Sequence, residues 1–557
     1  MELFLLWRSA RIGANEVRDE LERMLAPLFA RTPEVLVRRS GNPSLVVAHA
    51  PVPGWKRPFF EEDETGWTQA IEYPLDWAGS LRAAARSFDE NPAATLRELS
   101  PPFSLLWGAH DSEEIALQND GLGQAQLFEY QDEHLWAITN RIPALQALGV
   151  KLEPDPDEWA AATTLGWFPL DTTGYRRVRL LAPGTQLHVN AREVRRGSVD
   201  VLDDWLHPPE RPEAEWLEIG RASLLRYLQV ASRSWDASSV GLTGGWDSRA
   251  VVASLRVANA PFRARVKGPA GSPDVTLATE LARIAGIPLR HDDSAERPPS
   301  EAGEWRRGIA LALLWQGGQM DFDKHKTLFA NGRRLDDGQV NLMGQHGEIV
   351  RAFHYGEAVR RFPDGVVPDD VQMEERFISR RLAARLPYLR ADRIDRVSDI
   401  IRAAFLRAHD HRLTSIARLD FFYLFENTRR GNAASLAAQT GIVVTPFLNP
   451  DLIRAAFALS PAAKAHNTLH HHIVATNAPE WSSVPFDRKE EGASLQHGES
   501  RYYDARLAWR EVGASLIEDA LRDGGFWTEV FDPDLTRLHA FEAPDELAML
   551  AVLEDVL

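Results

Sequence analysis

The stretch GLTGGWDSRA, residues 241–250, decides the fold of the chain because it joins a short apolar run, SSV, to a longer one, AVVASL. This order predicts a strand, a tight turn and a helix. Gly244 and Gly245 let the backbone come close to a ligand, Thr243 adds a hydroxyl donor, and Ser248 stands at the helix start. Because the N–H groups of the turn face outward at a positive helix terminus, we expect an anion cradle here.

Asp247 is the unexpected member of this stretch. A carboxylate beside a phosphate repels it unless a hard cation lies between them, and Mg²⁺ is the natural bridge. The stretch lacks the lysine and the spacing of the common phosphate loop G-x-x-x-x-G-K-[ST]. A simpler alternative is that the glycines only make a tight turn and Asp247 only caps the helix.

The sequence that surrounds this stretch alternates between the two kinds of element. Strands are expected in SVGLT and RARVKG, and helices in LEIGRASLLRYLQVASRSW, SRAVVASLRVA and DVTLATELARIAG. This alternation predicts a parallel α/β sheet covered by helices. From Leu3 to about Trp205, short apolar runs between polar turns predict antiparallel sheet instead. The segment VDVLDDWLHPPERPEAEW is typical of a linker, and the chain beyond Asp370 is expected to be mostly helical.

The composition narrows the classes of function. A chain of 557 residues, 44% of them hydrophobic, is too long for one ordinary domain. Its net charge of −17, without a dense basic cluster, argues against nucleic acid as the main partner. The start of the chain lacks the features of a signal peptide, and no apolar run is long enough to span a bilayer, so we expect a cytoplasmic protein without a transmembrane segment. The chain has no cysteine, which excludes a cysteine nucleophile.

The loop at 241–250 resembles the pyrophosphate loop S-G-G-x-D-S of the asparagine synthetase superfamily, with Thr243 in place of the first serine. Further blocks similar to that family follow in order. They are RARVKGPAGSPDVTLATELARIAGIPLRHDD, VNLMGQHGEIVRAF, TPFLNPDLIRAAFALSP and VPFDRKEEGAS. In the front half, PPFSLLWGAHDSEEIALQNDGLGQAQLFEY and LLAPGTQLHV are similar to the family's amidotransferase-type domain.

The resemblance implies two domains with an α/β fold. Residues 1–205 would form an αββα sandwich of the N-terminal-nucleophile (Ntn) hydrolase type, and residues 206–557 an ATP-pyrophosphatase domain of the asparagine synthetase type with a helical C-terminal part. It also implies ATP and Mg²⁺ as cofactors, with Lys489 at the phosphates and two metal ligands, Asp247 and Glu348. The implied ATP and pyrophosphate site comprises Thr243, Gly244, Gly245, Asp247, Ser248, Val266, Lys267 and Gly344.

The chain departs from the family pattern at the glutaminase nucleophile. In glutamine-dependent members an exposed cysteine follows the initiator methionine, whereas residue 2 here is glutamic acid. The front domain is therefore expected to be an inactive glutaminase-like domain, a structural remnant or a docking surface. β-Lactam synthetases and lasso-peptide cyclases show the same loss, and in them the attacking amine belongs to the molecule that carries the activated carboxylate.

A second departure lies in MGQHGEIV, residues 343–350. Matching Gly344 to the family glycine places Gln345 where an acid is usual, His346 on a glycine, and Glu348 on the second metal-binding aspartate. Gln345 cannot act as a base, so His346 is the nearest candidate to accept the proton of the attacking amine. The alternative is that His346 only bonds a backbone group in the turn.

Other charged residues have a functional and a plain interpretation. Lys489 would stabilise the phosphate charge or be a solvated surface lysine, and Arg488 would hold pyrophosphate or form an exposed ion pair. Three consecutive histidines, 470–472, cannot chelate one ion from a helix, and we expect them on a polar face. Arg429 and Arg430 would meet a substrate carboxylate or pair with acidic side chains.

The resemblance implies an enzyme that adenylates a substrate carboxylate and lets an amine of the same substrate displace AMP. Our first choice is macrolactam closure of a ribosomal peptide by a lasso-peptide cyclase, with a leader-peptide-binding protein and a protease as possible partners. The alternatives are a β-lactam synthetase-like enzyme acting on an amino-acid-derived substrate, an ammonia-dependent asparagine synthetase, and a non-catalytic scaffold or binding protein.

Overall fold

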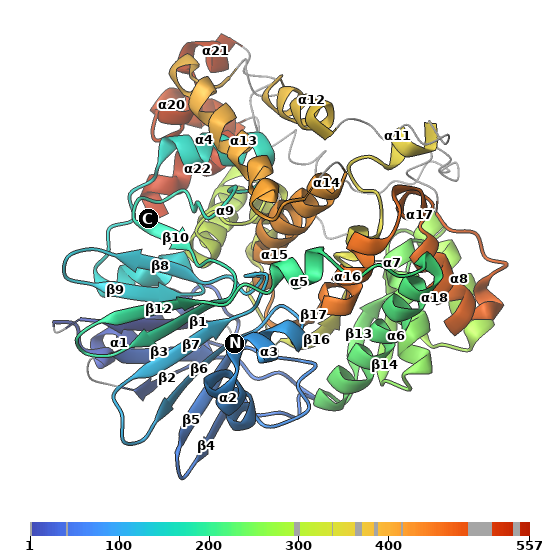
Figure 1. Cartoon of the computed structure of the whole chain (residues 1–557). Coiled ribbons are helices and arrows are strands. Elements are labelled where there is room, and N and C mark those ends of the chain that lie inside the picture. Colours follow the sequence, from blue (N-terminus) through green and yellow to red (C-terminus); the bar gives the residue numbers. More distant parts are fainter. Residues whose placement is uncertain are drawn as a thin grey trace.

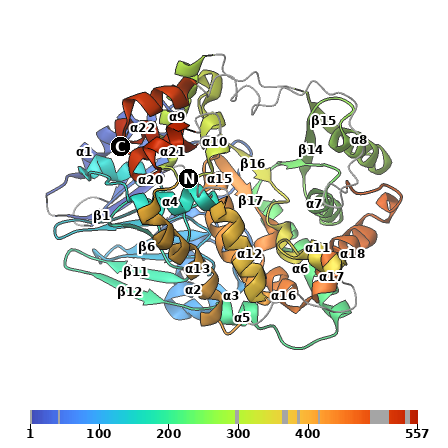
Figure 2. The ribbon, with the colours of Figure 1, turned by 90° about the horizontal axis from the view of Figure 1, so that it is seen from above.

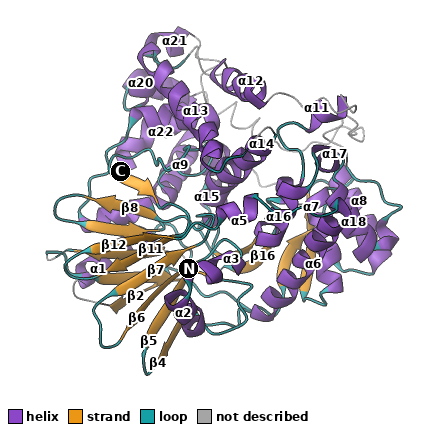
Figure 3. Cartoon of the chain, viewed as in Figure 1, coloured by secondary structure: helices purple, strands orange, loops and turns teal. Residues whose placement is uncertain are grey.

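The computed structural model shows a mixed α/β protein with three β-sheets and many helices (Figures 1 and 3). It describes residues 3–9, 11–39, 43–293, 301–336, 338–361, 370–383, 388–413, 416–487, 515–538 and 546–556. Among them no helix combines the length and the apolar character that crossing a membrane requires.

Two six-stranded sheets occupy the front of the chain, and every neighbouring pair of strands in them is antiparallel, which confirms the prediction for this region. The first has the order β10 (Val178–Leu180), β8 (Phe128–Gln131), β9 (Trp136–Thr139), β1 (Leu3–Arg8), β3 (Ser44–His49), β2 (Glu34–Arg39). The second has the order β12 (Val194–Ser198), β11 (Thr185–Val189), β7 (Ile115–Asn119), β6 (Ser104–Ala109), β5 (Gly66–Glu72), β4 (Phe60–Asp63).

The two sheets pack face to face between helices. Alternate residues of β1 point to opposite sides, so Phe4 and Leu6 share an apolar core with Leu106 and Leu117 of the second sheet. The outer face of the first sheet packs on α1 (Ala14–Leu25) and α4 (Pro156–Leu165), and that of the second on α2 (Leu81–Glu90). The layer order is therefore helix, sheet, sheet, helix.

The third sheet is parallel throughout and belongs to the second half of the chain. Its order is β15 (Leu289–Asp292), β14 (Phe262–Lys267), β13 (Ser238–Gly241), β16 (Gln339–Leu342), β17 (Gly441–Val444). From β13 the chain adds β14 and then β15 on one side of β13, and it then crosses to add β16 on the other side of β13. In such doubly wound sheets, ligands bind beyond the carboxyl ends of the strands at the point of reversal, which here lies between β13 and β16.

The predicted helices of this region are present and cover one face of the parallel sheet. They are α6 (Glu213–Ala231), α7 (Trp246–Val257) and α8 (Pro273–Ala285), with α16 (Pro450–Ala458) and α18 (Thr468–Asn477) from later in the chain. Nearly every residue of α7 from Arg249 to Leu255 is buried, because the helix lies between the sheet and α6 and α18. The apolar run after the opening loop thus forms the centre of this core.

The predicted linker differs from the expectation, because it contains α5 (Leu202–Leu206), whose Leu202, Trp205 and Leu206 are buried. The division into domains 1–205 and 206–557 remains a prediction. The other described helices, mostly beyond residue 370 as expected, are α3 (Pro92–Glu98), α9 (Ala302–Gln316), α10 (Phe322–Leu328), α11 (Gly356–Arg361), α12 (Asp370–Ala383), α13 (Ile394–Asp410), α14 (Ala417–Phe422), a π-helix (Tyr423–Asn432), α15 (Ala433–Ala437), α17 (Pro461–Ala465), α20 (Trp527–Val530), α21 (Pro533–Leu538) and α22 (Glu546–Val556).

Candidate active site

The point of reversal in the parallel sheet brings together the two loops that the sequence singled out. One follows β13 and leads into α7, and the other follows β16 and leads into the short 3₁₀ turn Gly347–Val350. The loops touch through glycines: a Cβ at Gly344 would lie 2.8 Å from the backbone N of Ser248, and one at Gly347 would lie 2.0 Å from Oδ1 of Asp247. Only residues without a side chain allow this close approach.

The loop after β13 is held by its own polar groups. The hydroxyls of Thr243 and Ser248 are 2.7 Å apart, and Gly245 N–H donates to Oγ1 of Thr243 over 3.1 Å. Gly244 N–H donates to Oδ1 of Asp274 over 3.0 Å. Gly245, the N-cap of α7, has no side chain to cap the first amides of the helix, so the helix start remains suited to an anion.

Asp247 lies on the first turn of α7 and has two nitrogen partners, an imidazole and a guanidinium. Nε2 of His470 lies 2.7 Å from Oδ1 of Asp247, and Nη1 of Arg351 donates to Oδ2 over 3.1 Å. Burial opposes ionisation of Asp247, but the hydrogen bond from His470 and the charges of His470 and Arg351 outweigh it and lower the pKa of Asp247. Asp247 is therefore held as a carboxylate.

Glu348 is the second carboxyl group of the site and is half-buried like Asp247, and Tyr423 donates its hydroxyl to Oε2 of Glu348 over 2.9 Å. Burial, followed by the negative charge of Asp247, raises the pKa of Glu348. Two carboxyl groups close enough to repel each other are the oxygen donors that a hard divalent cation binds and neutralises. The oxygen donors at this site are of the kind that suits Mg²⁺, and Asp247 and Glu348 are the residues that could hold it.

His346 has the backbone conformation expected of the glycine that it replaces. Its φ is 74°, in the left-handed region, and its side chain is fully buried. Neither ring nitrogen has a hydrogen-bond partner among the described residues, so the plain alternative of a bond within the turn is not observed. Burial lowers the pKa of His346 to about 3, which keeps the imidazole neutral and weakly basic.

The remaining predicted residues lie in different surroundings. Gln345 is partly buried in the same turn as His346. The side chain of Val266 faces the apolar core on the helix-covered side of β14, whereas Lys267 is exposed on the opposite side. Lys489 and Arg488 lie outside the described residues.

Sequence reasoning missed the residues that fasten the segment Val484–Asp487 to the loop. Arg249 is fully buried and donates to the carbonyls of Val484 and Pro485, each over 2.9 Å. Trp246 stacks on Phe486 with ring centroids 3.7 Å apart. An arginine within an apolar helix was a signal of such a role, but its partners lie more than 230 residues away in the chain.

The expectation of a polar face for the three histidines was wrong for His470, which is fully buried against Asp247. Three consecutive residues of a helix do point in different directions. His471 packs against the ring of Trp246, and His472 bonds Glu218 near the surface. The triplet therefore supplies one residue to the candidate site.

Arg429 and Arg430 lie in the π-helix and bind the front part of the chain. Arg429 donates to Oδ1 of Asp171 over 2.6 Å and to the carbonyl of Leu181 over 3.1 Å. Arg430 donates to the carbonyl of Phe168 over 2.8 Å. Both side chains are buried, so they hold the two-sheet region against the π-helix.

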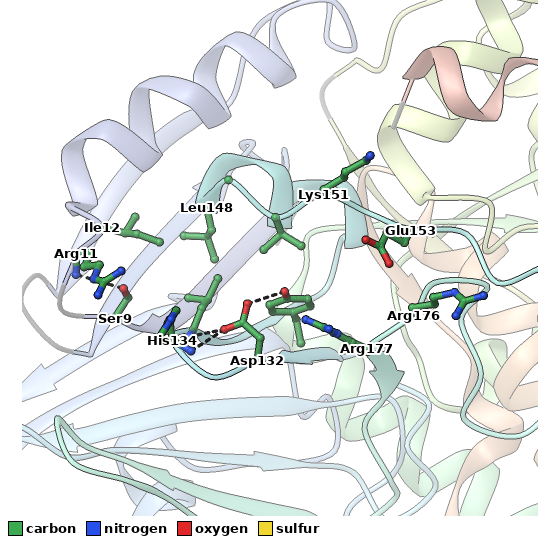
Figure 4. A pocket seen from close by; sticks show the side chains of 14 residues that line it. Ser9, Arg11, Ile12, Asp132, His134, Leu148, Lys151, Glu153, Arg176 and Arg177 are labelled. Carbon is green, nitrogen blue, oxygen red and sulfur yellow. Dashed lines mark hydrogen bonds between the residues drawn. The ribbon is translucent and has the colours of Figure 1, made fainter.

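The two-sheet region has a pocket of its own, of about 320 Å³, beside the end of β1 and the β8–β9 turn (Figure 4). Asp132 accepts hydrogen bonds from the hydroxyl of Tyr130 and from the backbone of His134 and Leu135. These contacts of Asp132 close the β8–β9 turn.

No protein-family model and no curated protein matches the sequence. Solved structures with some likeness include a glutamine phosphoribosylpyrophosphate amidotransferase from B. subtilis in complex with ADP and GMP, at 10% identity and a TM-score of 0.25. Another is an allosteric regulatory enzyme of purine biosynthesis, at 11% identity and a TM-score of 0.24. Each comparison covers 64% of this chain and 77% of the other. The assignment of function therefore depends on the site.

Proposed function

We propose that the protein is an ATP-dependent, AMP-forming amide ligase that closes a macrolactam in a peptide, in the manner of a lasso-peptide cyclase. The observation that carries this proposal is the meeting of Asp247 and Glu348 at the point of reversal of the parallel sheet, beside an uncapped helix start. A site with two carboxyl groups and a helix terminus suits a nucleotide triphosphate with its divalent cation.

The residues of the site have distinct tasks in this proposal. Asp247 and Glu348 hold Mg²⁺, which supplies neutralisation of phosphate charge when bound. The start of α7 would receive the β- and γ-phosphates of the co-substrate ATP while the substrate carboxylate attacks the α-phosphorus and pyrophosphate leaves. The amine of the same peptide would then attack the acyl carbon, form the amide and release AMP. Tyr423 orients Glu348 through its 2.9 Å hydrogen bond. Arg249 keeps the segment before Lys489 against the phosphate loop.

An exposed aromatic side chain favours a peptide over free aspartate as the substrate. Phe353 is 51% exposed and packs on the ring of Tyr423, with centroids 4.8 Å apart. An apolar surface next to the carboxyl groups suits a peptide side chain, whereas aspartate and ammonia offer nothing to cover it.

The test is formation of AMP and pyrophosphate from Mg-ATP with a panel of peptides containing Asp or Glu, compared with free aspartate and ammonia. We expect AMP together with a dehydrated peptide, and loss of both products in Asp247→Asn. Asp534→Asn, at a side chain 98% exposed, is the matched control and should match the unaltered protein. AMP with free asparagine would replace the proposal with a synthetase, and the absence of AMP with every substrate would favour a scaffold.

A further inference from the structure

The strand β14 has two different faces. Phe262, Ala264 and Val266 alternate with three cations, and Ala264 and Val266 are buried against the helices. Arg263, Arg265 and Lys267 are exposed on the other side. An interior strand of a parallel sheet is usually apolar on both faces because helices cover both, so β14 departs from the rule.

Among the residues that the structure describes, no helix of the connection between β15 and β16 covers the basic face of β14. The helices of this connection, α9 and α10, lie toward the two-sheet region and away from β14 and β15 (Figures 1 and 2). Between them is a groove of about 840 Å³, lined by the first residues of β13, β14 and β16 and by Pro53 and Gly54 of the two-sheet region. The groove therefore lies at the amino edge of the sheet, opposite the edge that holds Asp247.

Cations predominate among the charged residues that the structure describes in this groove. The lining includes three arginines, Arg263, Arg265 and Arg333, and two aspartates, Asp236 and Asp336. Asp236 is already neutralised from outside the lining, because Nζ of Lys56 lies 3.0 Å from its Oδ1. In a chain with a net charge of −17, such a local excess of positive charge is unusual.

Two of these arginines form no ion pair with any described residue. Arg263 makes no hydrogen bond or ion pair with any described residue, and Arg265 has only a 3.4 Å contact with Oδ1 of Asn341, a neutral group. Their side chains project from the same face of β14, two residues or about 7 Å apart, where like charges repel. A ligand with more than one anionic group would relieve this repulsion, and each guanidinium offers it a planar pair of donors.

We propose that this groove binds a small polyanion, a molecule with at least two phosphate or carboxylate groups that Arg263 and Arg265 hold. Its volume falls within the range of small-molecule sites. The rest of the lining supports a polar ligand, because it includes hydroxyl and amide side chains such as those of Ser239, Gln339 and Thr440. The proposal does not depend on the function proposed for the carboxyl edge.

The experiment is calorimetric titration of the full chain, without Mg²⁺, with tripolyphosphate and separately with citrate. The test variant carries Arg263→Gln and Arg265→Gln together. The matched control is Arg290→Gln, because Arg290 is exposed on the same face of the sheet, next to Arg265 in register, but outside the groove lining. Thermal unfolding of each variant reports its folding, which exposed substitutions should leave unchanged.

We expect at least one probe to bind the unaltered protein, and the double variant to weaken that binding by at least about tenfold, against less than about twofold for Arg290→Gln. Binding of tripolyphosphate alone assigns a phosphate ligand, binding of citrate alone a carboxylate ligand, and binding of both the shared anionic chemistry. Absence of binding for both probes, equal losses in the test and control variants, or a loss below about threefold in the double variant overturns the proposal.

Discussion

The two edges of the parallel sheet differ in the charge that they present. At the carboxyl edge, Asp247 and Glu348 lie together, and desolvation, followed by the negative charge of Asp247, raises the pKa of Glu348. At the amino edge, Arg263 and Arg265 stand in an open groove with no acidic partner among the residues that the structure describes. The two proposals therefore differ in the sign of the ligand, which is a cation with its nucleotide at the carboxyl edge and an anion at the amino edge.

The largest effect is expected where the two-sheet region meets the π-helix. Arg429→Met removes the fully buried donor to Oδ1 of Asp171 and to the carbonyl of Leu181, while Arg407 still bonds Oδ2 of Asp171. The free energy of unfolding should fall by about 3 kcal/mol, because hydrogen bonds to a charged group are lost and the buried carbonyl has no other donor among the described residues. The π-helix begins at Tyr423, so the loss should also weaken Mg-ATP binding at the carboxyl edge and spare the amino edge. Denaturant unfolding and calorimetry measure both effects.

The control for this change is Arg226→Met, at a side chain 65% exposed, which should alter the stability by less than about 1 kcal/mol. Equal losses in the two variants would mean that the buried arginine contributes no more than a surface ion pair. If Arg429→Met also lost polyanion binding, the two edges of the sheet would not bind their ligands independently.

Removal of the charge of Asp247 addresses the carboxyl edge alone. Asp247→Asn should reduce pyrophosphate release by more than about 100-fold, because the neutral amide no longer balances a cation beside the phosphates. Polyanion binding in the groove should change by less than about twofold in the same protein. A variant that retains pyrophosphate release would remove Asp247 from the proposed site, whatever happens at the amino edge.

For the parallel sheet, the sequence predicted the strands, helices and loops better than the side-chain contacts between them. The spacing of apolar residues predicted β13, α7, β14 and α8, because within each element this spacing follows from which of its faces is buried. The glycines and Asp247 of the first loop were recognisable from the local order of strand, turn and helix, whereas Gly344 and Glu348 of the second loop came from the family resemblance. The pairing of His470 with Asp247 was not, since it joins residues 223 positions apart and depends on how α18 packs on α7.

The exposed basic face of β14 is another feature that local sequence patterns could not predict. Cationic and apolar residues alternate in RARVKG, and this pattern is visible in the sequence. The expectation that helices cover the sheet did not predict an exposed basic face. Which face remains open depends on the path of the connection through α9 and α10, and no local pattern sets that path. Arg429 and Arg430 are the converse, because residues expected in an acceptor pocket or in ion pairs prove to join two regions of the fold.

A smaller effect is expected from a methyl group at the contact between the two loops. Gly347→Ala places a Cβ 2.0 Å from Oδ1 of Asp247, so either the turn or the carboxylate must move. We expect Mg-ATP to bind about tenfold more weakly, with polyanion binding unchanged. Gly303→Ala is the control, because a Cβ there meets nothing within 4 Å. Unchanged Mg-ATP affinity would show that the close approach has no functional consequence.

The smallest effect concerns acid. His346 lies at the carboxyl edge, and burial lowers its pKa from 6.5 to about 3, so below pH 6.5 the unfolded chain takes up a proton that the folded chain does not. Stability should therefore fall as the pH drops through 6.5. His346→Asn, which tolerates the left-handed backbone, should reduce the loss between pH 7.5 and 5.5 by about 1 kcal/mol, whereas the exposed His134→Asn should not. Denaturant unfolding at the two pH values gives both losses, and an acid sensitivity unchanged in His346→Asn would mean that the imidazole is protonated within the fold.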